Sequence, residues 1–267
     1  MKKLIAGIAL VLLLASTAQA KVGADEAAKL GTTLTPMGAE KAGNKAGSIP
    51  AWEGGLPQMN LPRGSNPLAA DKPLYTVTAA NLKQYESLLT EGQKTLFKTF
   101  ADYKMPVYPS RRSASYPQWF LDATKKNATA VELTNSGYGF KGTAQGYPFP
   151  IPKNGTEVMW NHIMRYNTKG FKGYGVTIPT QADGSWAPER SYLELTYIYN
   201  NPKTTVETLK NQNLYLLVKT LSPPNKAGTA DLLRVPIDRI AEQTGVWEFN
   251  PGLQRVRRIG EVGYDNP

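Results

Sequence analysis

Cysteine is absent from the 267 residues, and histidine occurs once, as His162. Without cysteine the chain forms no disulfide and offers no thiolate ligand to a metal, so its stability must come from packing. A single histidine also excludes a metal site built from several histidines. No nucleophile elbow, nucleotide loop or paired-carboxylate motif stands out. The sequence therefore gives no reason to assign a reaction or a cofactor, and we expect a protein that is not an enzyme.

Long apolar runs are also scarce, and the one that is present stands at the N-terminus. Two lysines precede an apolar run at residues 4–14, and Ala18 and Ala20 supply small side chains where a signal peptidase cleaves. The run is shorter than the roughly 20 residues that a membrane-spanning helix needs. We therefore expect a cleaved secretory signal at residues 1–20, and a mature protein of a bacterial periplasm with no transmembrane segment.

Positive charge exceeds negative charge, with 31 Lys and Arg residues against 21 Asp and Glu residues and a net charge of +10. Such an excess favours an anionic neighbour. In a periplasm that neighbour would be lipid headgroups, lipopolysaccharide or acidic glycans, so no nucleic-acid partner is expected. The alternative is that the charge only aids solubility.

The mature chain divides by composition into an arm and a domain. Residues 21–77 are rich in glycine, proline and turn signals, which excludes long helices and central strands. This stretch is either a disordered arm or an extended segment laid over the domain. Trp52 favours the second alternative, because a solvated arm rarely carries tryptophan. Residues 78–267 are expected to form a single domain.

The domain begins with helical patterns and ends with strand patterns. Three helical regions are predicted, at residues 78–104, 115–131 and 154–166. Thr78 is the expected cap of the first helix, and Thr90 with Gln93 forms a capping-box pattern for a second. Alternating segments then predict strands at residues 171–179, 191–200, 213–221, 229–237 and 246–259.

Short connections link these strands, and Asn250-Pro251-Gly252 is a hairpin signal. The strands should therefore pair as an antiparallel meander. Helices followed by strands predict an α+β fold.

Several segments together resemble one bacterial family. They read LTPMGAEKAGN at 34–44, IPAWEGG at 49–55, GYPFPIP at 146–152, GTEVMWNH at 155–162 and WEFNPGLQRVRR at 247–258. The chain thereby resembles the family called domain of unknown function thirteen twenty-nine, over nearly the whole mature sequence. The resemblance implies a fold related to the outer-membrane lipoprotein carriers, in which helices cross the open face of a strongly curved antiparallel sheet, an incomplete barrel.

The resemblance also implies a periplasmic protein beside a resistance-nodulation-division exporter and an outer-membrane partner. Members usually continue well beyond the equivalent of residues 264–267. We therefore expect a sheet that lacks its last strands, with an unpaired edge near residues 253–260.

Aromatic residues are numerous and supply the first candidate site. Six of them, expected on the last helix or among the strands, are candidate ligand-binding residues: Trp160, Trp186, Tyr197, Tyr199, Tyr215 and Trp247. A concave sheet lined in this way would form an apolar pocket for an acyl chain or a sterol-like molecule. The same rings could instead stack on sugars, with Glu53, Glu157 and Glu194 as carboxylates, or simply fill a core.

The arginines of the last predicted strand supply the second candidate site. Alternation puts Arg255 and Arg257 on one face of the strand and Arg258 on the other. These guanidinium groups could bind anionic headgroups or a partner protein. Alternatively they protect a sheet edge and pair with acids such as Asp238 and Glu248. The lone histidine is interpreted as a core residue with one hydrogen bond.

The leading hypothesis is a periplasmic, non-enzymatic binding or carrier protein for a hydrophobic ligand or a lipid-bearing partner, accessory to an envelope exporter. The alternatives are an envelope glycan-binding or carbohydrate-active protein, and a structural partner of an outer-membrane complex.

Overall fold

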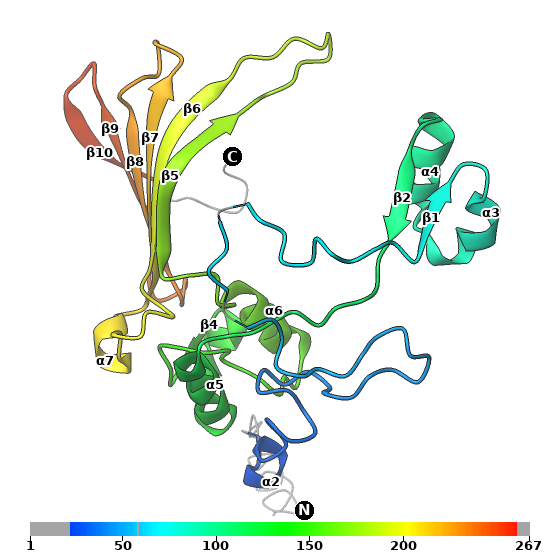
Figure 1. Cartoon of the computed structure of the whole chain (residues 1–267). Helices are drawn as coiled ribbons and strands as arrows, with labels where there is room; N and C mark the ends of the chain where they lie inside the picture. Colours follow the sequence, from blue (N-terminus) through cyan, green and yellow to red (C-terminus); the bar gives the residue numbers. More distant parts are fainter. Residues whose placement is uncertain (1–21, 58, 63, 261–267) are drawn as a thin grey trace, which may run out of the picture. The chain divides into compact units, whose positions relative to one another are not determined.

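The computed structural model describes residues 22–57, 59–62 and 64–260 (Figure 1). The signal peptide predicted at residues 1–20 lies outside this part of the chain. The described residues form an α+β structure with open antiparallel sheets, as predicted. None of their helices has the length and apolar character needed to cross a bilayer.

The chain divides into two compact units. The smaller unit comprises residues 40–115, and the larger unit comprises residues 22–39 together with residues from 116 onward. This division differs from the expected boundary at residue 77. The reason is a local strand pair, because β1 (Tyr75–Thr78) pairs with β2 (Lys104–Val107) and closes the smaller unit around the helices between them.

The smaller unit contains α3 (Leu82–Tyr85), the 3-10 turn η1 (Glu86–Leu88) and α4 (Glu91–Thr99). The predicted capping box of α4 is confirmed. Thr90 Oγ1 accepts a hydrogen bond from Gln93 N at 3.3 Å, and Gln93 Oε1 accepts one from Thr90 N at 2.9 Å. The expectation for Thr78 was wrong: it ends β1, and its N–H donates to the Asn81 side chain at 2.7 Å, so Asn81 precedes α3 instead.

The glycine- and proline-rich segment at residues 40–57 is held by hydrogen bonds within the smaller unit. Trp52 Nε1 donates to the carbonyl of Ala114 at 3.0 Å. The Arg112 guanidinium donates to three consecutive carbonyls, those of Glu40, Lys41 and Ala42. These bonds join the segment to residues that lie some 60 to 70 positions later, as expected for a segment laid over folded chain.

The larger unit contains a six-stranded sheet in the order β10-β9-β8-β7-β6-β5, with every neighbouring pair antiparallel. Its strands are β5 (Gly170–Thr177), β6 (Glu189–Tyr197), β7 (Gln212–Ser222), β8 (Ala230–Pro236), β9 (Gly245–Asn250) and β10 (Arg255–Ile259). The predicted meander and the predicted hairpin are therefore confirmed. β5 and β10 are the two edges of this open, curved sheet in the described part of the chain.

Helices and a small strand pair gather at one end of this sheet (Figure 1). These elements are α2 (Ala24–Ala27), α5 (Gln118–Ala130), β3 (Glu132–Thr134), η2 (Asn135–Gly137), β4 (Gly139–Lys141), α6 (Gly155–Ile163) and α7 (Val206–Leu209). Asn154 caps α6, because its Oδ1 accepts from Glu157 N at 3.0 Å. α5 starts directly after Pro117, whose missing N–H costs little at a helix start.

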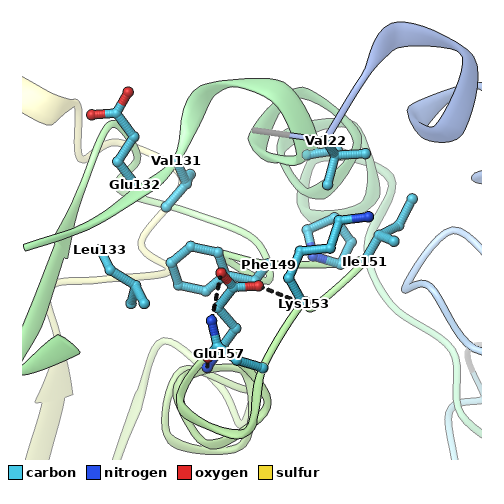
Figure 2. A pocket seen from close by; sticks show the side chains of 11 residues that line it. Val22, Val131, Glu132, Leu133, Phe149, Ile151, Lys153 and Glu157 are labelled. Atoms are coloured by element: carbon cyan, nitrogen blue, oxygen red, sulfur yellow. Dashed lines mark hydrogen bonds between the residues drawn. The ribbon is translucent and has the colours of Figure 1, made fainter. Parts of the chain in front are cut away.

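Two of the family-like segments lie against each other in the larger unit. Gly38 has a φ of +92°, and a Cβ at this position would overlap the carbonyl oxygen of Pro150. Only glycine therefore fits this approach. The segment at 146–152 also borders a small cavity between α5, β3 and the start of α6, into which Phe149 and Val131 project (Figure 2).

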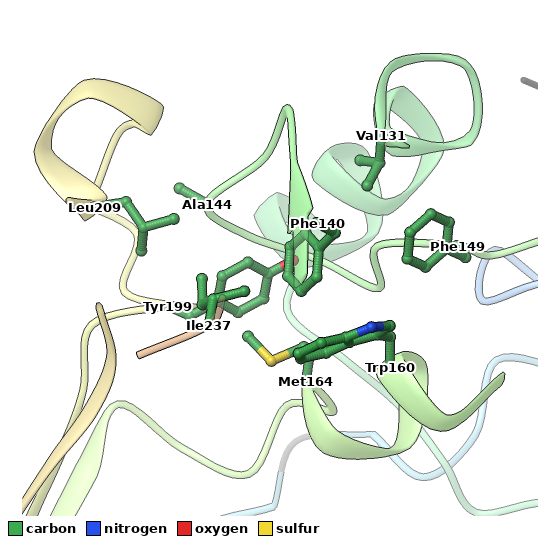
Figure 3. Close-up of a cluster of buried hydrophobic side chains, with 9 residues drawn as sticks. All are labelled: Val131, Phe140, Ala144, Phe149, Trp160, Met164, Tyr199, Leu209 and Ile237. Carbon is green, nitrogen blue, oxygen red and sulfur yellow. The ribbon is translucent and has the colours of Figure 1, made fainter. Parts of the chain in front are cut away.

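A compact hydrophobic core joins the helices to the end of the sheet (Figure 3). Its buried residues are Val131, Phe140, Ala144, Phe149, Trp160, Met164, Tyr199, Leu209 and Ile237. Tyr199 follows β6 and Ile237 follows β8, so the core sits where these strands end. The resemblance implied helices across the open face of the sheet. In the described residues, the core that joins helices to the sheet lies at its end.

Candidate functional site

The six-stranded sheet has two unlike faces, because successive side chains of a strand point to opposite sides. Residues paired across strands share a face, so the register assigns each side chain to one of them. We call the first the aliphatic face. It carries Phe171, Leu193, Leu195, Leu214, Leu216, Val218, Leu233, Val235, Val246 and Ile259.

One row of six apolar residues crosses the aliphatic face from edge to edge. In strand order it consists of Phe171, Leu195, Leu216, Leu233, Val246 and Ile259. Leu195, Leu216 and Leu233 have strands on both sides, yet all three remain partly exposed. Phe171 on β5 is 53% exposed. Val246 is 7% exposed, so the row is buried at that one position. Central-strand leucines beneath a second layer would be buried, so the rest of the larger unit, as far as it is described, leaves the centre of this face partly open.

Aromatic rings and cations share the opposite face, which we call the aromatic–cationic face. It carries Lys172, Tyr174, Val176, Arg190, Tyr192, Glu194, Tyr215, Leu217, Lys219, Leu232, Arg234, Trp247, Phe249, Val256 and Arg258. Tyr215 and Trp247, two of the predicted ligand-binding residues, come together here. The guanidinium of Arg234 lies between them, 5.4 Å from the Tyr215 ring centre and 5.2 Å from that of Trp247.

Trp160 and Tyr199, two further predicted ligand-binding residues, belong to the packed core. They are 9% and 1% exposed. Trp160 Nε1 donates to the Gly137 carbonyl at 2.9 Å, and the Tyr199 hydroxyl donates to the Gly146 carbonyl at 2.7 Å. Burial raises the pKa of the Tyr199 hydroxyl well above its usual value. Both polar groups are satisfied, which is the arrangement of core-filling aromatics.

The last two predicted aromatic residues lie elsewhere. Tyr197 ends β6, opposite Leu214, and its hydroxyl accepts a hydrogen bond from Asn167 Nδ2 at 3.2 Å. Trp186 is 60% exposed in the connection between β5 and β6. The six aromatic residues are thus spread over the core, both faces of the sheet and a loop, and they do not line one wall.

The larger unit has several cavities of different sizes. The one in Figure 2 has a volume of about 210 Å³ and is lined by apolar groups such as Val22, Phe149 and Ile151. A carboxylate at its rim is already engaged, because Glu157 Oε2 accepts from Lys153 N at 2.6 Å. Ligand pockets usually measure about 300–1,000 Å³. This cavity falls below that range, whereas a cavity of about 320 Å³ beside Trp160 and a more open one of about 450 Å³ beside Trp119 lie within it. The aliphatic face differs from these cavities because its apolar row runs across all six strands.

The arginines of β10 divide between the faces as predicted. Arg255 and Arg257 share a face with Glu248, and Arg258 lies on the other. Arg257 donates to Glu248 Oε1 through Nε at 2.9 Å and through Nη2 at 2.8 Å, so the predicted pairing with Glu248 is confirmed. The predicted pairing with Asp238 is wrong, because that carboxylate is held by groups of other elements.

Asp238 lies 8% exposed just beyond β8. Its carboxylate accepts four hydrogen bonds, from Thr134 Oγ1, Asn135 Nδ2, Ile240 N and Ala241 N. Burial opposes ionisation, but these bonds outweigh it and hold the pKa of Asp238 below its usual value. No signal in the sequence indicated that the Asp238 carboxylate connects the β3–β4 turn to the end of the sheet through hydrogen bonds.

A second carboxylate, Asp231, lies on the aliphatic face directly opposite Glu248. Burial and the negative charge of Glu248 both raise the pKa of Asp231. Arg257 forms an ion pair with Glu248. Asp231 faces the Glu248 carboxylate, and this arrangement disfavours the charged form of Asp231.

The remaining candidates have local roles. His162 is exposed on α6 with Arg165 Nη1 3.4 Å from its Nε2, so its interpretation as a core residue was wrong. Glu157 is engaged at the start of α6, and Glu194 accepts from the Tyr192 hydroxyl at 3.1 Å. Glu53 belongs to the smaller unit. Among the described residues, no three His, Asp or Glu side chains are grouped as a metal site requires.

Comparison with known proteins shows which family the chain belongs to. Residues 76–267 match the family described as "Protein of unknown function (DUF1329)". A Pseudomonas aeruginosa protein, "Uncharacterized protein PA3922", is 41% identical over 270 residues, which cover 98% of this chain and 59% of the relative. The chain thus spans less than two thirds of that relative, and no solved structure matches it. Since the family match covers most of the sequence, the chain belongs to the DUF1329 family, as its motifs indicated.

Proposed function

We propose that this family member is a periplasmic, non-enzymatic binding or carrier protein for a hydrophobic ligand or a lipid-bearing partner, accessory to an envelope exporter. The aliphatic face of the six-stranded sheet is its binding surface. The row of six apolar residues that crosses this face, with its central leucines partly exposed and Phe171 53% exposed, is the observation that carries the proposal.

Apolar burial supplies the affinity in this proposal. Each Å² of apolar surface removed from water contributes roughly 25 cal/mol. The centre of the face, at Leu195, Leu216 and Leu233, presents no hydrogen-bonding side chain. It would therefore accept an acyl chain or another apolar group without polar specificity. The absence of a recognisable catalytic motif fits a role in binding.

The test starts from protein isolated from its own periplasm. Osmotic-shock fractionation checks the location, and lipid extraction with native mass spectrometry looks for a bound hydrophobic molecule. We expect a co-purified lipid or lipid-like compound in the shock fluid. Protein that stays in the cytoplasm, or that carries no such molecule and binds no fluorescent fatty acid, would contradict the proposal.

Two neighbouring leucines of β7 provide a matched pair of variants. Leu216 lies on the aliphatic face and Leu217 on the opposite face, and both are partly exposed. Leu216→Lys should weaken fatty-acid binding about tenfold or more, because a charge would then oppose the apolar chain. Leu217→Lys should leave it unchanged. Thermal unfolding of both variants separates lost binding from lost folding.

One observation supports the glycan-binding alternative, namely the exposed indole of Trp186 in the β5–β6 connection. Exposed tryptophan rings can serve as platforms for sugars. A glycan array that shows binding, and loss of that binding in Trp186→Ala, would favour this function over the carrier. Capture of an envelope protein, without lipid or glycan binding, would favour a purely structural partner.

A further inference from the structure

A ladder of alternating rings and cations crosses the aromatic–cationic face. Tyr215 on β7, Arg234 on β8, Trp247 on β9 and Arg258 on β10 follow one another across four neighbouring strands. Arg234 contacts the rings of both Tyr215 and Trp247, and the Arg258 guanidinium lies 5.7 Å from the Trp247 ring centre. Each cation is therefore held at an aromatic surface.

The backbone makes room for this ladder at Gly245. A Cβ at Gly245 would approach the Trp247 indole to 2.5 Å, so the ring occupies the space that a side chain would otherwise fill. The Trp247 ring is thus placed between the two guanidinium groups by the local sequence of β9.

The two guanidinium groups are not neutralised. Across residues 22–57, 59–62 and 64–260, the side chains of Arg234 and Arg258 make no hydrogen bond or ion pair, and both residues are exposed. In contrast, Arg257 on the other face is paired with Glu248. The planar N–H groups of the ladder arginines remain available for an anion, which guanidinium binds in a bidentate manner.

The rest of the face has the same chemistry. It holds three more cations, Lys172, Arg190 and Lys219, against a single acid, Glu194. Apolar and aromatic side chains stand exposed among them, with Tyr174 at 81%, Val256 at 65% and Val176 at 57%. Rings and basic side chains mixed with exposed apolar groups are typical of surfaces that lie in the headgroup region of a bilayer.

We propose that the aromatic–cationic face docks on the surface of an anionic phospholipid bilayer, with Arg234 and Arg258 on lipid phosphates and Trp247 at the headgroup level. Charge complementarity carries this assignment, and the exposed apolar groups favour a lipid surface over an acidic protein. The proposal goes beyond ligand carriage, because it concerns the face opposite the aliphatic one. Vesicle binding is measured without a ligand, so either proposal can fail alone.

The test is co-sedimentation of the full chain with vesicles of phosphatidylcholine, with and without phosphatidylglycerol. We expect binding only to the anionic vesicles, and weaker binding at high salt because exposed charges are screened. Each basic residue near an anionic surface contributes about 1 kcal/mol, so Arg234→Gln with Arg258→Gln should lower vesicle affinity roughly tenfold or more. Absence of binding by the unaltered protein would overturn the proposal.

The control removes the same charge elsewhere. Lys125 and Lys126 are exposed on α5, and Lys125→Gln with Lys126→Gln should weaken binding far less. An equal loss in the two double variants would mean that net charge alone acts, and the docking face would be wrong. As a second readout, brominated phosphatidylglycerol should quench tryptophan fluorescence, and Trp247→Phe should remove much of that quenching. Unchanged quenching in this variant would also overturn the proposal.

Discussion

Asp238 Oδ2 accepts a hydrogen bond from Asn135 Nδ2 at 2.7 Å, although the two residues are 103 positions apart in the chain. Asn135 has a φ of +46° and begins the tight turn between β3 and β4. The same carboxylate oxygen accepts from Thr134 Oγ1 at 2.8 Å. This one buried side chain therefore fixes the turn against the end of the sheet.

Replacement of the Asp238 carboxylate should make the free energy of unfolding less dependent on pH in the acidic range. Asp238→Asn turns an acceptor into a donor that faces other donors, which should lower the free energy of unfolding at neutral pH by about 1–3 kcal/mol. Because the pKa of Asp238 is lowered by folding, its contribution is present above the ordinary aspartate pKa of about 3.9 and is lost as pH falls through the folded value. Urea titrations at several pH values measure this.

The difference between wild type and Asp238→Asn should therefore shrink as the solution is acidified. Asp102→Asn, at an exposed position of the smaller unit, is the control and should change stability little at any pH. A constant difference from neutral to acidic pH would show that the charge of Asp238 does not contribute.

Asp231 should behave in the opposite way. Its pKa is raised by burial and by Glu248, so the folded state disfavours its charged form. Asp231→Asn should increase stability at neutral pH, and the gain should vanish as pH falls below the ordinary aspartate pKa of about 3.9. Thermal unfolding at neutral and acidic pH tests the sign. A loss of stability at neutral pH would mean that Asp231 has a favourable partner.

Two tyrosines near the end of β6 should differ although they are two residues apart. Tyr199→Phe leaves the Gly146 carbonyl without its 2.7 Å hydrogen bond inside the core, and should cost about 1–3 kcal/mol of stability. Tyr197→Phe loses a partner that is exposed to water and should cost less than about 0.5 kcal/mol. Equal effects in chemical denaturation would contradict the core assignment of Tyr199.

Alanine variants of two glycines near the N-terminus can distinguish the cost of backbone strain from the cost of a steric clash. Gly31 and Gly38 have φ values of +87° and +92°, but only Gly38 faces another segment, at Pro150. Gly31→Ala should cost about 1–2 kcal/mol, the strain of a left-handed alanine. Gly38→Ala should cost about 1–3 kcal/mol more, because the methyl group collides with backbone. Equal melting temperatures for the two variants would rule out the contact.

The strands of the large sheet could be predicted as five segments that show alternation, the last of which, 246–259, contains the hairpin that separates β9 from β10. β7, for example, spans Gln212–Ser222, within one residue of the predicted segment. β1–β2 and β3–β4 were not found, because their strands have only three or four residues and a period of two needs more. The pairing of β1 with β2, which the sequence pattern did not reveal, joins residues on both sides of position 77 in one compact unit.

The residues of the candidate site were harder to predict from the sequence than the strands, and Tyr199 shows why. Alternation with Tyr197 suggested that both lie on one face of a strand. β6 ends at Tyr197, and Asn200 with a φ of +62° turns the chain, so Tyr199 enters the core instead. The division of Arg257 from Arg258 was correct because β10 continues through both. The ladder at Arg234 was missed, since it requires the register of four strands.

Neighbouring residues of a strand, such as Leu216 and Leu217, lie on opposite faces of the sheet, and we propose different binding roles for these two faces. Deletion of a single residue from the middle of β7 would move every later side chain of that strand to the opposite face. Apolar side chains would then lie on the aromatic–cationic face, and basic ones on the aliphatic face. Loss of two residues would keep each on its own side. Length changes inside these strands should therefore be accepted in steps of two, whereas the loops between them are free of this rule.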